Sequence, residues 1–346
     1  MSDSITPSGA AAWQNEWRSA ADNLRSRTNR PAGVTTVVII TRDRCESLRR
    51  TLQALAMAAG VHEIIVVDNA STGCSVAAVC EEFPCVRYLS LGVNLGAAAR
   101  NIGVAHATTE FVAFSDDDSW WEPEAIPRAL TCFRDFPGLG LVSGAVLVGT
   151  ESRLDHVSCL QARSPLPRTA SLPGPAILGF LACAAIVRTI AYREVGGYSG
   201  FLDVGGEEQL LALDMRSAGW DLCYRSDVTV RHFPASRSSA YVSRRLVMET
   251  RNRLLITWLR RPWRTAARMT MAEVRQCLQS REKAVGMMEA LIRFPRLWKH
   301  RRVVRPELES DIQLLERQQQ TLNDECGSAS TPLRPGKGSD RLREGG

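Results

Sequence analysis

Four runs rich in β-branched residues alternate with helical segments over residues 34–122, and this alternation limits the possible fold more than any other feature. The first run is VTTVVIIT, and the segment after it has apolar side chains at Leu48, Leu52, Leu55 and Ala59, the spacing of one helix face. Strands that alternate with helices in this way predict a mostly parallel sheet with helices on both faces. The sequence therefore predicts an α/β fold, whose ligands bind at the carboxyl ends of the strands.

Polar side chains gather at the ends of three of these predicted strands. They are Thr41, Arg42 and Asp43 after the first strand, Asp68 and Asn69 after the second, and Asp116, Asp117 and Asp118 after the fourth. Three consecutive carboxylates repel one another unless a cation or hydrogen-bond donors compensate them. Asp116 and Asp118 point to the same side of an extended chain, so they can share one divalent ion and leave Asp117 for backbone or ribose contacts. The alternative is an Asp-rich turn that caps the next helix.

A second group of candidate residues follows in the second half of the chain. Glu207 and Glu208 come directly after the flexible pair Gly205-Gly206 and open a predicted helix. A carboxylate on such a hinge is suited to act as a general base, although ordinary capping of the helix dipole explains the same pattern. The predicted strand DVTVRH ends at His232, which is either a metal ligand or an ordinary histidine at a strand end.

Taken in order, these pieces resemble the inverting family-2 glycosyltransferases, especially bacterial rhamnosyltransferase-like members. The resemblance covers about residues 37–262, and its pieces are VVIITRDRCESLRRTLQAL, EIIVVDNAST, NLGAAARNIG, FSDDD, EVGGYSG, GGEEQ, the histidine at the strand end and the pair Arg251-Asn252. It implies a GT-A-type fold, in which a Rossmann-like sheet is flanked by helices and followed by a helical C-terminal extension. It also implies transfer of a sugar from a nucleoside-diphosphate sugar by a metal-assisted single displacement that inverts the anomeric carbon.

The resemblance assigns a role to each candidate residue. Those that border the donor nucleotide are Thr41, Arg42, Asp43, Asp68, Asn69, Arg100 and Asn101. Asp116 and Asp118 match the family's Asp-x-Asp pair, in which Asp118 binds Mn²⁺ or Mg²⁺ and Asp116 acts on the ribose or through water. His232 matches a late ligand of the metal or the diphosphate. Glu208 stands where the family has its catalytic aspartate, and Glu207 is the alternative base.

The sequence departs from the family at positions beside the acceptor. Ser199 stands where an acid often follows the Gly-Gly-aromatic turn, and Leu210 and Asp214 replace the family's usual Asp and Arg. The donor chemistry is therefore better defined than the acceptor, which we expect to be a hydroxyl of a glycan or of a lipid-linked molecule. The resemblance favours dTDP-rhamnose or a UDP-hexose as the donor.

Composition divides the chain into regions. Residues 1–33 form a polar arm, and residues 34–240 form the catalytic domain, with a nucleotide-binding half up to residue 122 and an acceptor half from residue 123. Residues 241–322 are a basic helical region, and residues 323–346 are predicted to be a disordered tail. Residues 231–305 contain 19 Lys/Arg and 4 Asp/Glu. Basic amphipathic helices with Trp and Leu are typical of proteins that lie on anionic membranes, although packing across the catalytic domain explains them equally well.

The remaining features concern location and alternative functions. The longest apolar run, residues 177–187, has 11 residues, whereas about 20 are needed to span a bilayer. The ten cysteines show no Cys-x-x-Cys pair, so we expect reduced, buried cysteines in a cytoplasmic protein that is at most peripheral on the membrane. One alternative is a sugar-nucleotide nucleotidyltransferase, but the Gly-rich loop expected of such an enzyme is missing from this sequence. The other is a non-catalytic protein that binds nucleic acid or membrane. No nucleic-acid partner is expected, because no helix-turn-helix or zinc pattern is present.

Overall fold

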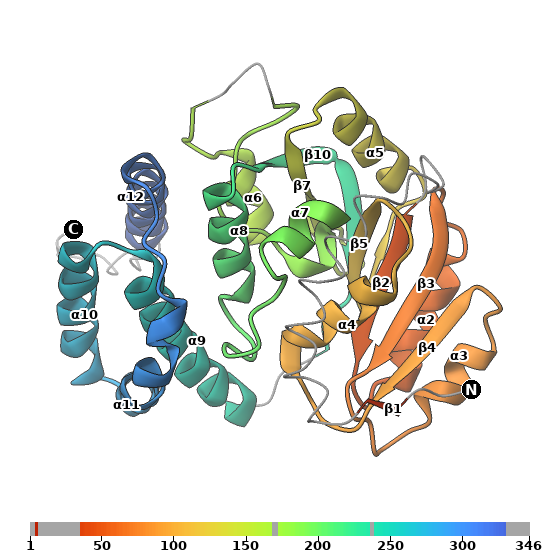
Figure 1. The fold of residues 1–346 in the computed structure, drawn as a ribbon, viewed down its shortest axis with the longest axis horizontal. Coiled ribbons are helices and arrows are strands. Elements are labelled where there is room, and N and C mark those ends of the chain that lie inside the picture. The colour runs from red at the N-terminus through yellow and green to blue at the C-terminus, as the bar shows by residue number, and fades with distance from the viewer. Residues whose placement is uncertain (1–3, 6–34, 168–171, 236–238, 330–346) are drawn as a thin grey trace, which may run out of the picture.

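The computed structural model describes residues 4–5, 35–167, 172–235 and 239–329, with side chains for residues 35–321 of these ranges (Figure 1). The polar arm therefore lies outside the described residues, apart from its short strand β1. Within the described ranges ten strands join one sheet in the order β1-β4-β3-β2-β5-β9-β7-β10-β6, and β8 pairs with β7. The strands are β1 (Ser4–Ile5), β2 (Thr35–Thr41), β3 (Val61–Asp68), β4 (Val86–Leu91), β5 (Phe111–Asp116), β6 (Ser119–Trp121), β7 (Leu139–Val148), β8 (Arg153–Leu154), β9 (Ala185–Arg188) and β10 (Asp221–His232).

The sheet has a parallel part and a mixed part. The pairs β4–β3, β3–β2 and β2–β5 are parallel, and so is the pair β7–β10. Strand β9 runs antiparallel to both of its neighbours, β5 and β7, and β6 runs antiparallel to β10. The prediction of a mostly parallel α/β sheet is confirmed for the nucleotide-binding half.

Helices cover both faces of the sheet because successive side chains of a strand point to opposite sides. Val37 and Ile39 of β2 contribute to one core and Val38 to the other. The first core is completed by α2 (Cys45–Leu55), α3 (Val76–Glu81) and α5 (Ala125–Asp135), and the second by α4 (Ala99–His106), α7 (Thr189–Glu194) and α8 (Glu207–Ser217). Strands buried on both faces in this way keep their ends in fixed positions, which is what a site at the sheet edge requires.

The C-terminal helices pack against α8 and lie on its far side from β2 and β3 (Figure 1). They are α9 (Ser239–Arg260), α10 (Trp263–Cys277), α11 (Arg281–Leu297) and α12 (Pro306–Ala329). Leu255 of α9 and Ile312 of α12 share a third core with Leu210 of α8. Helix α12 runs to Ala329, which corrects the predicted start of the disordered tail. Within the described residues, no helix combines the length and hydropathy that a membrane-spanning segment requires.

The cysteines differ in part from the expectation that all are reduced and buried. Cys45, at the start of α2, forms a disulfide with Cys74, in the loop before α3. Cys85 is exposed. The free cysteines that are buried as predicted are Cys80, Cys132, Cys183 and Cys223. The disulfide escaped the sequence reading because its partners are 29 residues apart and become neighbours only where β2 and β3 end side by side.

Candidate active site

The carboxyl ends of β2, β3 and β5 bring the predicted polar residues to one edge of the sheet. In the strand register, Thr41 is paired with Asp68, and Asp116 is paired with Ile40. These positions are adjacent because the three strands are parallel neighbours. The prediction that the ends of these strands meet is therefore confirmed.

His232 reaches the same edge through β6 and β10. The chain turns after Asp118 into β6, which pairs antiparallel with the end of β10, so that Ser119 lies opposite His232. The backbone N–H of Phe233 also donates to the carbonyl of Asp118, at 2.9 Å. As a result, the imidazole Nε2 of His232 lies 3.3 Å from a carboxylate oxygen of Asp118.

Asp118 is buried between two cationic partners. Arg44 Nη2 donates to its Oδ2 at 2.7 Å, and His232 approaches its Oδ1. Burial acts to raise the pKa of Asp118, but the hydrogen bonds from His232 and Arg44 outweigh it and hold that pKa below its usual value. Burial likewise opposes the charge on His232, but the contact with Asp118 raises the pKa of the imidazole. The arrangement favours the ionised form of both side chains.

The other two aspartates of the triplet have different surroundings. Asp117 is buried, accepts a hydrogen bond from the Thr41 hydroxyl at 2.8 Å and lies 2.7 Å from Arg44 Nη1. Burial dominates there and raises the pKa of Asp117 to about 7. Asp116 forms an ion pair with the buried Arg100 and is the most accessible of the three, with 35% of its side chain exposed. Asp116 is therefore the aspartate best placed to meet a ligand directly.

Glu207 and Glu208 begin α8 directly after a glycine hinge. Gly205 and Gly206 have φ angles of 97° and 90°, in the left-handed region that favours glycine. Glu207 is buried, and its Oε2 has no hydrogen-bond partner among the described residues, whereas Glu208 is half-buried. Burial raises the pKa of both carboxyls. A carboxyl whose pKa is raised toward neutrality is better suited to act as a general base.

Arg251 and Asn252 of α9 hold the loop in front of this hinge. The side-chain amide nitrogen of Asn252 donates to the carbonyls of Leu202, Val204 and Gly205, at 2.6, 3.1 and 2.6 Å. Arg251 Nη2 donates to the carbonyl of Leu202 at 2.9 Å. Both side chains are buried. The Arg-Asn pair that takes part in the family resemblance therefore positions the start of α8.

A cavity of about 1070 Å³ lies at this edge of the sheet, and we call it the sheet-edge cavity. Its volume suits a nucleotide-sized ligand, because small-molecule sites usually measure about 300–1,000 Å³. Tyr241, Arg245 and Arg253 of α9 line its side opposite the strands. The predicted site residues that line it are Thr41, Arg42, Asn69, Arg100, Asp116, Asp117, Asp118, Glu207, Glu208 and His232. The structure thus brings ten candidate residues from both halves of the chain around one space.

Three predicted donor-binding residues are not among those that line this cavity. The Asp43 carboxylate accepts hydrogen bonds from two backbone N–H groups of residues 71–74, at 2.6 and 2.7 Å. Asp68 accepts one from the same loop and one from the Tyr88 hydroxyl, each at 2.9 Å. Asn101 makes three hydrogen bonds of 2.6 to 2.9 Å to α7 and the turn after it. These side chains are engaged by neighbouring loops, and their predicted contact with the nucleotide stays a prediction.

Arg44 is the main residue of the site that the sequence reading missed. Its guanidinium contacts both Asp117 and Asp118, at 2.7 Å each. The sequence does place Arg44 between the end of a predicted strand and the start of a predicted helix, at the edge where three consecutive aspartates need a positive charge. This position is the signal that could have identified it. Arg245 and Arg253 were missed because the basic character of α9 was interpreted as a surface property.

The side chains at the sheet edge fit a hard divalent cation. Asp116 and Asp118 offer carboxylate oxygens, the ligands that Mn²⁺ and Mg²⁺ prefer, and His232 would offer a nitrogen once its imidazole has lost the proton that Asp118 stabilises. Within the described part of the chain, no three His, Cys, Asp or Glu side chains already surround a common point. The protein would therefore supply part of the coordination and leave the rest to phosphate and water, as is usual for Mg²⁺.

The chain is similar to known glycosyltransferases. Residues 36–196 match the family model described as Glycosyl transferase family 2. These 161 residues are slightly less than half of the 346-residue chain. The pre-mycofactocin glycosyltransferase of Mycobacterium tuberculosis is 30% identical to the chain over 219 residues, which are 61% of this chain and 45% of that protein. The chain thus spans about half the length of the curated relative it matches. These matches favour glycosyl transfer over the two alternatives raised by the sequence.

Solved structures support the fold. The mannosyltransferase PcManGT from Pyrobaculum calidifontis, in complex with GDP-Man and Mn²⁺, has a TM-score of 0.51 at 16% identity, over 93% of this chain and 84% of that chain. TarS from S. aureus, in complex with UDP-GlcNAc, has a TM-score of 0.52 at 19% identity, over 65% of each chain. The GT-A-type fold that the sequence resemblance implies is confirmed.

Proposed function

We propose that the protein transfers a sugar from a nucleoside-diphosphate sugar to an acceptor hydroxyl, with inversion at the anomeric carbon. The observation that carries this proposal is the sheet-edge cavity, where the aspartates at and directly after the end of β5, His232 of β10 and the carboxylates of α8 meet. A departing nucleoside diphosphate needs positive charge beside it, and the attacking hydroxyl needs a base. The cavity offers both.

Glu208 is the proposed general base, because it is half-buried and lines the cavity, whereas Glu207 is only 4% exposed. Glu208 takes the proton of the acceptor hydroxyl while the oxygen bonds to the anomeric carbon and the bond from that carbon to the diphosphate breaks. A contribution of about 10²–10⁴-fold is typical of such a base. One base and one direction of attack describe a single displacement, which needs no covalent intermediate.

Mn²⁺ or Mg²⁺ is the proposed cofactor, held by Asp116, Asp118 and His232. When bound, such an ion stabilises the negative charge of the leaving diphosphate as a Lewis acid. The complex of PcManGT with GDP-Man and Mn²⁺ supports a divalent ion in this fold. Arg100 and Arg245 line the same cavity, where they pair with Asp116 and Glu249, so their charge reaches the diphosphate when those pairs open.

The proposed donor is dTDP-rhamnose or a UDP-hexose, and the proposed acceptor is a hydroxyl of a glycan or of a lipid-linked molecule. The donor rests on the family resemblance, and the complex of TarS with UDP-GlcNAc supports a uridine nucleotide. A thermal-shift screen with UDP-, dTDP- and GDP-sugars, each with and without Mn²⁺, identifies the donor. A ligand present at 100 times its Kd stabilises the protein by about 2.7 kcal/mol, which such a screen detects.

Two variants test the roles of the carboxylates with the donor found in this way. Glu208→Gln should retain the donor-induced thermal shift and lose transfer by about 10²–10⁴-fold, since only the base is removed. Asp118→Ala should lose the Mn²⁺-dependent part of the shift. Glu151→Gln, which removes an exposed carboxylate, is the matched control and should behave as the wild type. Full transfer activity in Glu208→Gln would show that another group is the base.

We also propose that α10 and α11 rest on an anionic membrane surface. Met271 of α10, Leu278 directly after it, and Met288 and Ile292 of α11 are 61 to 85% exposed. They lie in a region with a large excess of Arg and Lys. Exposed apolar side chains on basic helices are typical of interfacial binding. Sedimentation with phosphatidylserine-containing vesicles should capture the protein, and Leu278→Glu should weaken capture. Equal capture by purely zwitterionic vesicles would contradict the proposed role of charge.

A further inference from the structure

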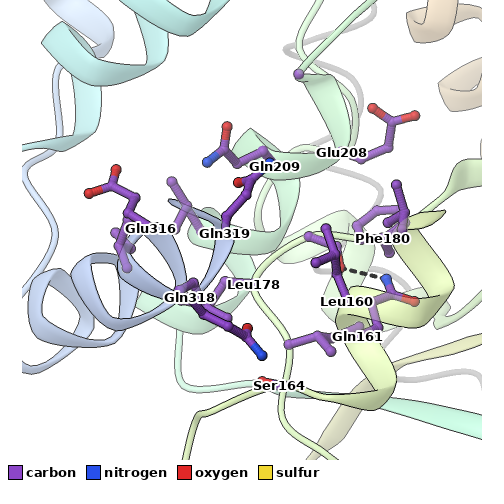
Figure 2. A pocket seen from close by; sticks show the side chains of 17 residues that line it. Leu160, Gln161, Ser164, Leu178, Phe180, Glu208, Gln209, Glu316, Gln318 and Gln319 are labelled. Atoms are coloured by element: carbon purple, nitrogen blue, oxygen red, sulfur yellow. Dashed lines mark hydrogen bonds between the residues drawn. The ribbon is translucent and has the colours of Figure 1, made fainter. Parts of the chain in front are cut away.

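A second cavity, of about 350 Å³, adjoins the sheet-edge cavity at the start of α8. Figure 2 shows the side chains that line the second cavity. It lies between α6 (His156–Ala162), residues 177–180, α8 and α12. Glu208, Gln209 and Phe180 line both cavities. The proposed base therefore borders two separate spaces, one that suits the nucleotide sugar and one that remains for a second substrate.

The lining of the second cavity combines apolar side chains with side-chain amides. Leu160 and Leu178 contribute apolar surface, together with Phe180. The amides are those of Gln161, Gln209, Gln318 and Gln319, from α6, α8 and α12 (Figure 2). Gln161 is already engaged by the Ser143 hydroxyl and the carbonyl of Gly179, and Gln318 Nε2 donates to the carbonyl of Arg163. The amides of Gln209 and Gln319 can donate to and accept from a hydroxyl group, and the apolar wall matches the C–H face of a saturated ring.

The charge of this cavity argues against an anionic ligand. No lysine or arginine is among the described residues that line it, and its ionisable groups are the carboxyls of Glu208 and Glu316. Arg261 lies behind Glu316, with Nη1 and Oε1 2.6 Å apart, and is shared with the buried Glu309. One guanidinium thus faces two carboxylates, so no net positive charge remains for a phosphate or carboxylate of a ligand.

Helix α12, which forms one wall, is outside residues 36–196 that match the family model. It is nevertheless firmly attached to the catalytic domain. Gln318 Nε2 donates to the carbonyl of Arg163 at 2.5 Å, and Arg261 of the segment after α9 holds Glu309 at 2.5 Å. The wall is therefore a fixed part of the site, supplied by the C-terminal extension of this particular chain.

We infer that the second cavity is the acceptor subsite and that it selects a neutral, hydroxylated ring, such as an uncharged pyranose. This inference rests on the proposed function. A volume near the lower end of the usual range for ligand sites, about 300–1,000 Å³, suits one ring rather than an oligosaccharide. The ring presents one hydroxyl to Glu208. Its proton passes to the Glu208 carboxylate, its oxygen bonds to the anomeric carbon of the donor sugar, and the nucleoside diphosphate leaves with the electrons of the broken bond.

The first test fills the cavity from α12. Leu315 lines the second cavity and not the sheet-edge cavity, so Leu315→Trp should obstruct the acceptor alone. Gln320→Trp adds the same ring to an exposed position of the same helix and is the matched control. The assay compares transfer to a panel of neutral methyl pyranosides with slow hydrolysis of the donor in the absence of acceptor. Leu315→Trp should reduce transfer by about tenfold or more, equivalent to about 1.4 kcal/mol, and leave donor hydrolysis unchanged.

The second test changes the charge preference and applies even if Leu315→Trp does not fold. Gln319 is exposed on α12, so Gln319→Lys should fold and place a cation in the cavity. The wild type should prefer neutral pyranosides to the matching uronides, and the variant should shift the ratio of the two transfer rates toward the uronides by about tenfold, since one opposite charge is added.

The outcomes separate the inference from the function on which it rests. If no nucleotide sugar stabilises the wild-type protein and none is hydrolysed by it, the proposed function itself fails. If the donor is bound and hydrolysed but uronides are the better acceptors, only the inference fails. The same holds if no neutral pyranoside is accepted, or if Leu315→Trp transfers as fast as Gln320→Trp.

Discussion

Replacement of Asn252 by alanine tests how the C-terminal helices position the proposed base. Asn252 is fully buried, and its one amide nitrogen serves the carbonyls of Leu202, Val204 and Gly205 directly before the hinge of α8. Asn252→Ala removes both N–H donors. The carbonyl of Leu202 keeps the donor from Arg251, whereas those of Val204 and Gly205 lose theirs. The loop then loses the contact that determines where Glu208 stands.

The magnitude follows from the number of donors lost. A buried group left without its partner costs about 1–3 kcal/mol, so two such groups correspond to a loss of about 2–6 kcal/mol in the free energy of unfolding. If the loop relaxes by about 1 Å, misplacement of Glu208 reduces transfer by about 10²-fold. The affinity for the donor should change less, because the Asn252 amide does not hold Arg100, Asp116 or Asp118 in place.

Urea unfolding and steady-state transfer assays measure the two effects on the same preparation. Arg244→Ala, at an exposed position of the same helix, is the control and should change the free energy of unfolding by no more than about 0.5 kcal/mol. An Asn252→Ala protein that unfolds at the wild-type urea concentration and transfers at the wild-type rate would refute the positioning argument. Reduced stability with full activity would show that the hinge keeps its place without the amide.

Two further predictions concern the disulfide and the pH dependence. Cys45→Ser removes a disulfide that closes a loop of 29 residues and should lower the free energy of unfolding by about 3–4 kcal/mol. Wild-type protein treated with dithiothreitol should match the variant. Equal stability of the wild type in reducing and non-reducing urea titrations would contradict this prediction. Burial raises the pKa of Glu208 to about 8. Because a general base acts only when it is ionised, kcat/KM should increase as the pH rises through this pKa and should be low at more acidic pH. An acid limb near the usual glutamate pKa, about 4.3, would contradict the assignment of Glu208.

The parts of the fold that follow local patterns could be predicted from the sequence. The β-branched run before Thr41 and the run before Asp116 became neighbouring parallel strands, because alternating strands and helices restrict the topology to few choices. The approach of His232 to Asp118 was expected only through the family resemblance. It depends on the antiparallel register of β6 and β10, whose residues lie more than 100 positions apart, and no local pattern encodes such a register.

The direction of individual side chains was the part that sequence reasoning could not supply. Asp43 and Asn101 stand at positions that border a nucleotide in the resembling family, yet each side chain is engaged by backbone groups of neighbouring loops. Arg44 was missed because its carboxylate partners, Asp117 and Asp118, are distant in the sequence. A strand end determines where a residue stands, whereas the partners that capture its side chain come from distant loops.

The charge balance of the sheet edge explains how three consecutive aspartates coexist with a stable fold. Arg100 pairs with Asp116, and Arg44 spans the next two aspartates, with His232 closing the other side of the triplet. A divalent cation that arrived alone at these carboxylates would therefore compete with positive charges already in place. A diphosphate that binds together with the cation would balance the charge of the cation and of an arginine that the cation displaces from its aspartate. The charges at the sheet edge therefore favour joint binding of the cation and the diphosphate. Because such coupling is reciprocal, we expect the residues that balance the aspartate triplet also to make the affinity for the proposed metal depend on the nucleotide.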